Sequence, residues 1–217
     1  SNSHLTMENV NIYSCSGHAM TIGGTQQYTH FKNVNIVRPP NSERRAITCT
    51  ADHLHISSSR GYIKIEDCEF SRGADDCINF HDCTTFMYPY SATSLKTMND
   101  RNTYLYAVGQ TLEFRHGDYS PTDFSATVVA LNVLDAENGI REVVFDRELP
   151  EAYMDGFVLF NRAYDTSNII VRNCYFHDNR ARGILILASN VTMENCRFFH
   201  NEMGALKFET GYTTNSW

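Results

Sequence analysis

Val171-Arg172-Asn173-Cys174-Tyr175-Phe176 is the stretch that decides the fold, because the chain repeats its pattern several times. The pattern reads apolar, polar, Asn or Asp, then Val or Cys, then polar, then Ile or Phe. Other copies begin at Met7, Phe31, Ile65 and Met193. A repeat written this regularly indicates stacked copies of one small structural unit.

The spacing of the copies indicates how those units are arranged. The shared Asn or Asp falls at positions 9, 33, 67, 173 and 195, so neighbouring copies are 24, 34, 106 and 22 residues apart. In the last three copies a second strand pattern follows at a constant offset of ten residues. Strands that recur once per unit, with Asn at a turn and no helical periodicity, are typical of a solenoid. The sequence therefore predicts an all-β fold, a parallel β-helix whose coils stack ~4.8 Å apart.

Alternation along the second strand of each coil predicts which side chains fill the interior. Successive residues of a strand point to opposite faces, so the apolar positions share one face. We expect the interior to contain Leu54, Ile56, Ile78, Phe80, Ile184, Ile186, Leu206 and Phe208. The residues between and beside them are predicted to point outward: His55, Asn79, His81, Lys207 and Glu209.

The gap of 106 residues predicts an insertion, because it exceeds one coil by about 84 residues. We expect β-helix coils over 1–81, an inserted subdomain over 82–166 and further β-helix coils over 167–217. Short strand patterns at 110–114, 126–131, 142–145 and 157–160, with a turn signal at Asn138-Gly139, favour a small antiparallel β-barrel or meander. Tyr88 or Tyr90 is expected to supply a stacking wall beside the carboxylates.

Charge and hydropathy argue against two classes of partner. The formal net charge is −7 and no cluster of Lys or Arg is present, which argues against nucleic acid. No apolar run approaches the length of a membrane span. A solenoid needs caps at both ends and neither is apparent, so we expect a piece of a longer protein.

Cysteine usage favours a structural role. Of the seven cysteines, Cys68, Cys174 and Cys196 occupy the repeat position that holds Val10 and Val34. This position predicts small buried residues in a stack rather than disulfides or metal ligands. The shared Asn position likewise indicates a ladder of turns. We therefore predict no metal and no cofactor.

Three aspartates are predicted to share one patch on successive coils. Asp52 and Asp76 are 24 residues apart, the same separation as Leu54 and Ile78, so we expect them to be registered neighbours with Asp75 beside them. Repulsion between like charges raises the pKa of at least one carboxyl and keeps it protonated near neutral pH. One carboxylic acid and one carboxylate are what hydrolysis of a glycosidic bond requires.

Two other interpretations of the aspartates stay open. Asp52 and Asp75 are also suited to capping the turns before their strands. Clustered acidic oxygens also suit Ca²⁺. The nearby histidines, which are His53, His55 and His81, favour a site over simple turn caps.

Arg182 is predicted to lie beside Asp76, because Gly183 aligns with Cys77 in the repeat. Two roles remain open for its guanidinium group, namely an ion pair with Asp76 or donation to sugar hydroxyls. The complete set of candidate substrate-binding residues is His53, His55, Asn79, His81, Arg180, Arg182, Lys207 and Glu209.

These residues resemble a known family. Ala51-Asp52-His53-Leu54-His55-Ile56-Ser57, Ile65-Glu66-Asp67-Cys68-Glu69-Phe70, Asp75-Asp76-Cys77-Ile78-Asn79-Phe80-His81 and Arg180-Ala181-Arg182-Gly183-Ile184-Leu185 look like segments of the glycoside hydrolase family 110 α-1,3-galactosidases. The resemblance runs from about Asp52 to Phe208. The spacing of the aspartates is also similar to that in the polygalacturonases, although the Gly-His-Gly and Arg-x-Lys elements expected there are not evident.

The resemblance implies a right-handed parallel β-helix with inserted barrel elements. It implies inverting exo-hydrolysis of terminal α-1,3-linked galactose, with the acid and base roles falling on Asp52, Asp75 and Asp76. A glycan is then the substrate, and we expect a secreted, periplasmic or cell-surface protein. The polygalacturonase-like layout suggests that Asp52 and Asp76 hold a water as the base pair and that Asp75 is the proton donor.

The distance between acid and base is the geometric consequence of an inverting mechanism. Inverting glycosidases hold their two carboxyls ~6.5–9.5 Å apart to admit a water, against ~5–5.5 Å in retaining ones. We therefore expect the longer separation between Asp75 and Asp52. Two further functions remain as alternatives: another β-helix carbohydrate-active enzyme (a polygalacturonase-like hydrolase or Ca²⁺-dependent polysaccharide lyase), and a non-catalytic carbohydrate-binding solenoid.

Overall fold

Two compact units make up the chain in this computed structural model, which describes all residues except 1, 83, 98–105, 153–154 and 210–217. The first unit joins Ser1–Asp82 to Tyr164–Thr210 and is a solenoid. The second consists of the described residues between 84 and 163. A short 3₁₀ helix, η2, covers Arg162–Tyr164 where the chain passes from the second unit to the first.

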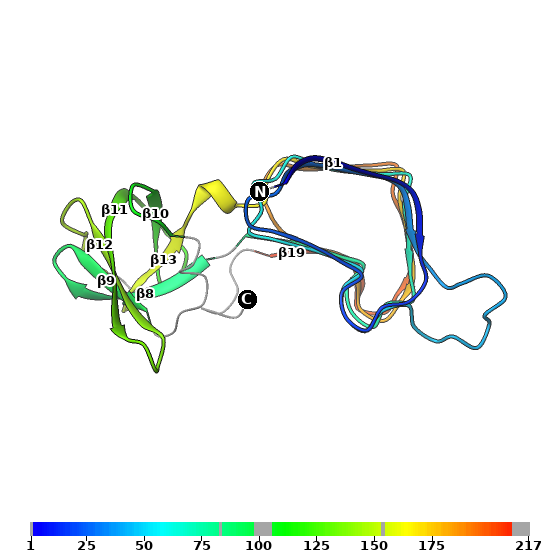
Figure 1. Cartoon of the computed structure of the whole chain (residues 1–217), viewed down its shortest axis with the longest axis horizontal. Coiled ribbons are helices and arrows are strands. Elements are labelled where there is room, and N and C mark those ends of the chain that lie inside the picture. The colour runs from blue at the N-terminus through cyan, green and yellow to red at the C-terminus, as the bar shows by residue number, and fades with distance from the viewer. Residues whose placement is uncertain (1, 83, 98–105, 153–154, 210–217) are drawn as a thin grey trace. The chain divides into compact units, whose positions relative to one another are not determined.

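Parallel strands of successive coils form the solenoid, and Figure 1 views it along its axis so that the coils superimpose. In the described residues the first sheet has the order β17-β14-β5-β3-β6-β15-β18, with β1 also paired to β3. The strand bounds are β1 Ser3–Ile12, β3 Gln27–Ile36, β5 Ile63–Glu66, β6 Glu69–Ser71, β14 Ile169–Arg172, β15 Tyr175–Asn179, β17 Val191–Glu194 and β18 Arg197–Asn201.

The second sheet carries the strands on which the candidate site residues were predicted. Its order is β19-β16-β7-β4-β2, again entirely parallel. The strand bounds are β2 Met20–Gly23, β4 Leu54–Ser57, β7 Ile78–His81, β16 Arg182–Leu187 and β19 Gly204–Phe208. The predicted all-β parallel β-helix is therefore confirmed.

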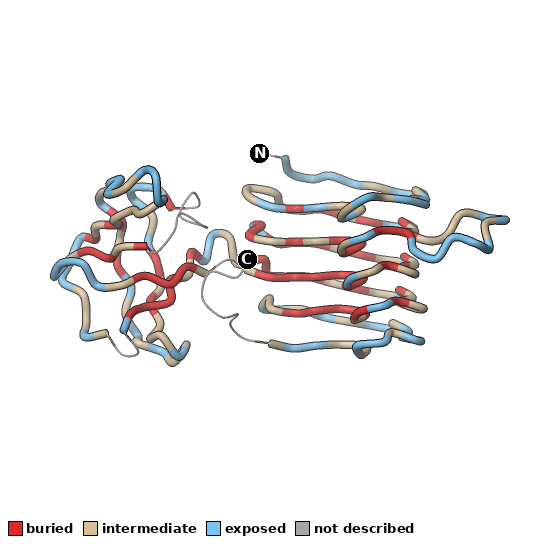
Figure 2. The backbone as a smooth tube through the Cα atoms, turned by 90° about the horizontal axis from the view of Figure 1, so that it is seen from below, coloured by how far each residue is buried: buried red, intermediate tan, exposed pale blue. Residues whose placement is uncertain are grey.

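The core lies between these sheets and follows the predicted register. Leu54 pairs with Ile78 and Ile56 pairs with Phe80, and all of these side chains are fully buried. Aromatic rings also stack from coil to coil, since the centroids of Phe70 and Phe176 are 5.4 Å apart. In Figure 2 the buried positions run along the inner coils, whereas the terminal coils are more exposed.

The shared Asn position forms the turn ladder that the sequence predicted. Asn9, Asn33, Asp67, Asn173 and Asn195 all have positive φ between 50° and 58°. Their side chains bond between coils, as in the donation from Asn33 Nδ2 to Asn9 Oδ1 at 2.8 Å. Asn tolerates the left-handed conformation better than most residues, which explains why it recurs here.

The cysteines of the repeat are small buried residues, as predicted. Cys68 and Cys174 are 2% and 1% exposed, and Cys196, one coil further, is half-buried. The cysteines within the described part of the chain are free thiols. Burial of thiols inside the stack therefore accounts for the repeated Cys.

One prediction about the interior is wrong, and two outward-facing residues are more buried than their place on the strand indicates. Phe208 was expected in the interior but is 69% exposed, because β19 is the last strand described and only β16 covers it. Asn79 and His81 alternate with the core residues of β7 as predicted, yet they are only 1% and 2% exposed. Residues on the outer face of a strand are solvent-exposed only where nothing else covers them.

The second unit contains a closed antiparallel barrel, with strand order β10-β11-β12-β9-β8-β13 among the described residues. The strand bounds are β8 Thr84–Ser91, β9 Ser94–Thr97, β10 Thr111–His116, β11 Pro121–Asp135, β12 Ile140–Phe145 and β13 Phe157–Phe160. Its first and last strands, β8 and β13, pair with each other. Phe114 and Phe157 are buried in its core.

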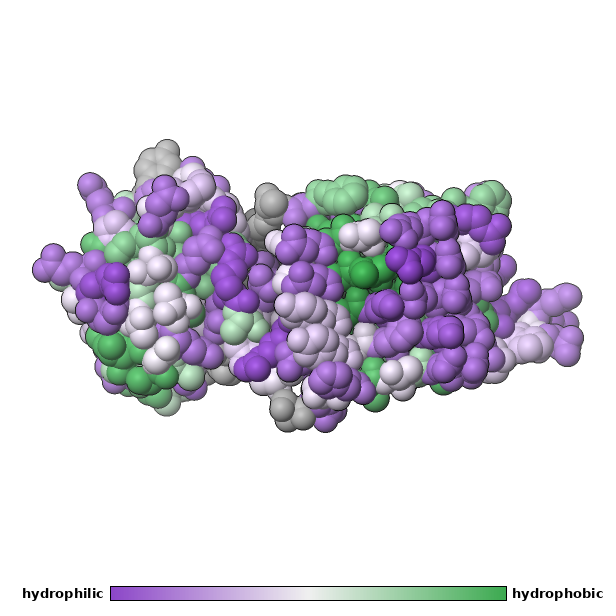
Figure 3. Space-filling model, turned by 90° about the horizontal axis from the view of Figure 1, so that it is seen from above, coloured by the Kyte–Doolittle hydropathy of each residue, from purple (hydrophilic) through white to green (hydrophobic). Residues whose placement is uncertain are grey.

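The visible surface of the solenoid in Figure 3 is mainly hydrophilic and is interrupted by a hydrophobic patch. Within the described residues, no helix has the length and apolar character needed to cross a membrane.

Candidate active site

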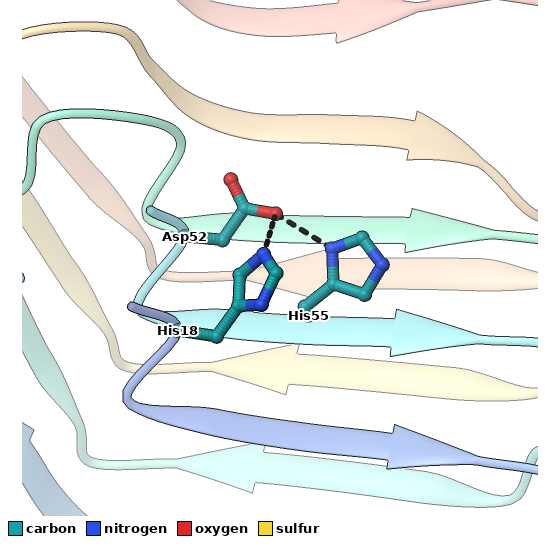
Figure 4. Close-up of side chains that lie close together, drawn as sticks. All are labelled: His18, Asp52 and His55. Carbon is teal, nitrogen blue, oxygen red and sulfur yellow. Dashed lines mark hydrogen bonds and ion pairs between the residues drawn. The ribbon is translucent and has the colours of Figure 1, made fainter. Parts of the chain in front are cut away.

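Asp52 lies immediately before β4 and is the most highly connected of the three predicted carboxylates. Asp52 is 3% exposed. Oδ1 accepts the backbone N–H of Asp76 at 3.2 Å, and Oδ2 is 2.7 Å from Nδ1 of His55. Figure 4 shows His55 and His18 turned toward this oxygen, with His18 Nε2 at 3.7 Å. Asp52 is thus fixed on both of its oxygens.

Asp76 lies on the next coil, in register with Asp52, and is 1% exposed. Its Oδ1 accepts the backbone N–H of Arg182 at 3.0 Å and the Nε–H of Arg182 at 2.8 Å. Burial raises the pKa of Asp76, and these hydrogen bonds from Arg182 oppose that rise. Of the two roles left open for Arg182, the structure contains the ion pair with Asp76.

Asp75 differs from the other two because it is exposed. Its Oδ1 accepts the backbone N–H of Asp76 at 3.0 Å. The backbone carbonyl of Asp75 accepts a hydrogen bond from Asn179 Nδ2 at 2.6 Å. The turn that carries Asp75 is therefore held from the neighbouring coil while its carboxylate faces solvent.

The predicted convergence of the three aspartates is present. One carboxylate oxygen from each of Asp52, Asp75 and Asp76 lies within 4.8 Å of the others. That approach is closer than the ~6.5–9.5 Å between carboxyl groups that we expected for Asp75 and Asp52. The two measures are not the same, since the carboxyl carbons lie behind the oxygens that approach each other.

Of the three histidines that were predicted at the site, one lies in the interior and two lie on the face that carries the carboxylates. His53 is fully buried, with Nε2 2.9 Å from Thr48 Oγ1 and 3.0 Å from the Ser71 carbonyl. Burial lowers the pKa of His53 to about 4. The ring of His53 packs inside the solenoid near Phe70, and its role as a substrate ligand stays a prediction.

His55 and His81 lie on the site face and contact each other. Their Nε2 atoms are 3.0 Å apart, and the His81 Nδ1 is 2.8 Å from the carbonyl oxygen of Asp82. Burial lowers the pKa of His81 to about 4. His81 and Asn79 are 2% and 1% exposed, and their predicted role in sugar binding stays a prediction.

The remaining predicted ligands are Arg180, Lys207 and Glu209. Arg180 is exposed, and its backbone N–H donates to the carbonyl of Gly73 at 3.1 Å. Lys207 and Glu209 form an ion pair with each other at 2.9 Å. Lys207 pairs with Leu185, which pairs with Asn79, so Lys207 lies two strands away from Asn79 in the same sheet. Tyr88 and Tyr90 belong to the barrel unit, and their stacking role stays a prediction.

Sequence reasoning missed two residues of this site. His18 precedes β2 and is 34 residues before Asp52, the same separation as Met20 and Leu54, so the register alone would have found it. Asn179 is 1% exposed, and its amide also joins the backbone N–H of Gly73 and the carbonyl of Arg182. No motif marks Asn179, because its role depends on contacts across coils.

Two groups in the described part of the chain have donor atoms close enough for a metal ion. They are His18, Asp52 and His55, and Asp52, Asp75 and Asp76. Both share Asp52, whose oxygens already make hydrogen bonds to His55 and to the backbone of Asp76. The absence of a metal stays a prediction.

Comparison with known proteins shows which proteins this chain is similar to. A family model described as a right-handed β-helix region matches residues 135–216. The chain is 27% identical over 217 residues to α-1,3-galactosidase A of Shewanella woodyi, covering 94% of this chain and 34% of that protein. It is 27% identical over 201 residues to α-1,3-galactosidase B of Bacteroides thetaiotaomicron, covering 87% and 31%.

A third relative gives the same result. α-1,3-Galactosidase A of Bacteroides fragilis is 26% identical over 216 residues, covering 94% of this chain and 35% of that protein. The chain thus spans about a third of the length of these relatives. The right-handed β-helix is confirmed, and so is the chain's similarity to the α-1,3-galactosidases.

Proposed function

We propose that this chain carries the acid and base residues of a glycosidase that removes terminal α-1,3-linked galactose from glycans by an inverting mechanism. The activity belongs to the whole protein, because the chain spans only about a third of its galactosidase relatives. The substrate class comes from the names of those relatives and from the resemblance in the segments around the aspartates.

The observation that supports a hydrolase best is the contrast among the three carboxylates. Asp52 and Asp76 are buried and each has a basic partner, His55 and Arg182 respectively. Asp75 is exposed. Carboxyl groups in different environments have different proton affinities, which is what lets one act as an acid and another as a base.

The roles follow from that contrast. Asp75 is the carboxyl that reaches solvent, so it is the one placed to protonate the departing sugar oxygen. Burial raises the pKa of Asp76, and the hydrogen bonds from Arg182 oppose that rise by favouring the ionised form that a base requires. Asp52 and Asp76 then orient the attacking water between successive coils.

The stereochemical outcome is tested directly, because the close approach of the oxygens is not itself an argument for inversion. A longer protein that contains this chain and has the length of its galactosidase relatives is incubated with an α-1,3-galactosyl disaccharide, and the anomer released first is identified by NMR. Release of β-galactose supports the proposal. Release of α-galactose shows retention, and no hydrolysis of any α-galactoside shows that the proposed substrate is wrong.

A Ca²⁺-dependent lyase is the second candidate, favoured by the approach of three carboxylate oxygens within 4.8 Å. A chelator separates the two, since a hydrolase that uses only carboxylates keeps its rate after chelation. Loss of activity on chelation, restored by added Ca²⁺ and accompanied by an unsaturated product, would favour the lyase.

A further inference from the structure

A second row of residues in the left-handed conformation runs along the solenoid, at the corner near the start of β1, β3, β5, β14 and β17. Its members have positive φ between 54° and 59°, and they are His4, Tyr28, Tyr62, Asn168 and Asn190. They are in register, because the residues that follow them pair from coil to coil. Figure 1 shows this corner beside the N-terminus. We call this row the corner ladder.

The corner ladder differs in composition from the turn ladder. The turn ladder holds Asn or Asp at positions 9, 33, 67, 173 and 195, and these residues tolerate positive φ. The corner ladder instead begins with one His and two Tyr before it continues with Asn. A left-handed backbone costs a bulky aromatic residue more than it costs Asn. The fold therefore explains the Asn residues of the corner ladder but not Tyr28 and Tyr62.

The aromatic rings of the corner ladder stack on one another. The ring centroids of His4 and Tyr28 are 4.8 Å apart, and those of Tyr28 and Tyr62 are 4.9 Å apart. Contact between the rings stabilises the stack. Tyr28 and Tyr62 are nevertheless 44% and 50% exposed. The stack thus presents aromatic surface to solvent.

The stack ends at Tyr62, because the next coil holds the shorter Asn168 at the same position. One face of the Tyr62 ring lies against Tyr28, which belongs to the preceding coil. On the side of the following coils the surface is hollowed, with a volume of about 510 Å³. Side chains that line this hollow include those of Tyr62, Lys64, Asn168, Asn190 and Thr192. The hollow therefore lies next in line after the last aromatic ring.

The lining of the hollow combines an aromatic ring with neutral polar groups. Asn168 and Asn190 supply side-chain amides, and Asn190 Nδ2 lies 3.5 Å from Asn168 Oδ1. Thr192 is exposed and supplies a hydroxyl group. Lys64 is the charged residue of the lining, and its Nζ lies 3.7 Å from Glu66. Such a lining favours an uncharged ligand that carries both C–H and hydroxyl groups.

A pyranose ring has this chemistry. The C–H groups of one sugar face pack on an aromatic ring, and the hydroxyls donate to and accept from amides. The volume of about 510 Å³ lies within the ~300–1,000 Å³ that is usual for small-molecule sites. Nucleic acid bases also stack on tyrosine, but the net charge of −7 disfavours their phosphates.

We propose that the hollow beside Tyr62 is a second sugar-binding site, in which a neutral pyranose stacks on Tyr62 and takes the next place in the corner ladder. Its hydroxyls bond to the amides of Asn168 and Asn190. Asp52 precedes β4 and Tyr62 follows it, so this site is separate from the carboxylates. It holds a glycan to the solenoid away from the bond that is cleaved. Only the choice of galactose as the sugar rests on the proposed function.

Binding is measured on this chain by NMR, with tyrosine labelled with ¹³C in its ring. The probe is α-1,3-linked galactobiose, and Asp75→Asn is present in every sample so that the disaccharide is not consumed. We expect the Tyr62 ring signals to shift during the titration. The C–H protons of the bound sugar should move upfield, as protons above an aromatic face do.

Cellobiose is the second probe, because it is also neutral but contains β-linked glucose. Shifts of the Tyr62 signals with cellobiose but not with galactobiose would support the sugar site and contradict galactose as its ligand. Unchanged Tyr62 signals with both disaccharides would overturn the proposal.

Tyr62→Asn separates a binding role from a structural one. Asn occupies the equivalent positions 168 and 190, so relief of backbone strain offsets the lost contact with Tyr28, and the urea midpoint should change little. Affinity for the sugar should fall about tenfold, because the stacking surface is lost. A lower urea midpoint with unchanged affinity would overturn the proposal. Tyr13→Asn, at another exposed tyrosine, is the control and should keep the affinity.

Asn168→Tyr tests the hollow itself. Tyrosine already adopts the required φ at positions 28 and 62, so this change extends the aromatic stack and fills the hollow. Sugar binding should be lost although Tyr62 is still present. Asn173→Tyr places the same ring in the turn ladder of the same coil and should leave the affinity unchanged. Unchanged binding in Asn168→Tyr would contradict the proposed location.

Other molecules that stack on tyrosine provide the competing outcomes. A short oligothymidylate and a proline-rich peptide are titrated under the same conditions, and we expect neither to shift the Tyr62 signals. Shifts with one of them and none with the sugars would overturn the proposal. Hydrolysis by the longer protein without sugar binding at Tyr62 would contradict this inference alone. Sugar binding at Tyr62 without hydrolysis would contradict the proposed function alone.

Discussion

Arg182 binds the carboxylate of Asp76 twice, through its backbone N–H at 3.0 Å and its Nε–H at 2.8 Å. The backbone N–H of Cys77 donates in return to the carbonyl of Arg182 at 3.0 Å. One residue of β16 thus fixes both the position and the charge of a buried carboxylate on the preceding coil.

Removing the arginine should destabilise the solenoid. Arg182→Met leaves the carboxylate of Asp76 buried without a cation, and breaking a largely buried ion pair in this way costs about 3 kcal/mol. Urea unfolding followed by circular dichroism measures the change. Lys32→Met is the control, because the ion pair of Lys32 with Glu8 lies at the surface and contributes about 0–1 kcal/mol. Equal losses in the two variants would contradict the assignment.

Acid should weaken the fold through its buried histidines. The pKa of His53 and that of His81 are lowered to about 4 by burial, whereas an unfolded histidine has a pKa of ~6.5. Between these values the unfolded chain binds more protons, so the free energy of unfolding falls as pH decreases from ~6.5 to about 4. Each histidine contributes about 3 kcal/mol over that range.

The matched pair for this pH dependence is His53→Gln and His200→Gln. The first should lose part of the slope of unfolding free energy against pH, because it removes a buried ring. The second should keep the slope, because His200 is exposed. An identical slope in all three proteins would show that His53 does not titrate as proposed.

Turnover should depend on Asp75 far more than stability does. Asp75→Asn keeps the shape of the side chain but cannot give up a proton, and losing a general acid lowers kcat by about 10²–10⁴-fold. The measurement is hydrolysis of an α-galactoside by the longer protein. Asp67→Asn is the control, since the equivalent positions of other coils already hold Asn. Undiminished turnover in Asp75→Asn would remove Asp75 from the mechanism.

Phenylalanines in the stack and at its end should differ in their contribution to stability. Phe176 is fully buried between Phe70 and Phe198, at centroid distances of 5.4 Å and 4.9 Å. Phe176→Ala should therefore cost about 3–5 kcal/mol. Phe208→Ala, at a side chain that is 69% exposed, should change stability by less than about 0.5 kcal/mol. Both values come from denaturant titration.

The register of the coils could be predicted from the sequence because it is a matter of counting. Leu54 and Ile78 pair as the spacing of 24 residues requires, and Asp52 and Asp76 follow from the same count. A solenoid repeats its backbone from coil to coil, so one correct alignment of the pattern fixes every pair.

The orientation and burial of individual polar side chains could not be predicted in the same way. His53 stands at the turn before β4, where the alternation of a strand does not yet apply, and it points inward. Asn79 and His81 obey the alternation but are buried. Their burial depends on neighbouring side chains, as in the contact between His81 and His55, which a pattern within one strand does not contain.

The pairing of β8 with β13 has a consequence for how the chain folds. Ile63 and Ile169 are partners in the solenoid although 106 residues separate them, so this contact closes a very long loop. Pairing of Thr84 with Phe160 inside the barrel brings the two ends of the inserted segment together first. We expect pulse-labelled hydrogen exchange to find the amides of β13 protected before those of β14. Pairing within the barrel therefore shortens the effective loop between the two parts of the β-helix and lowers the entropy cost of closing it. The later coils can then assemble on the earlier ones.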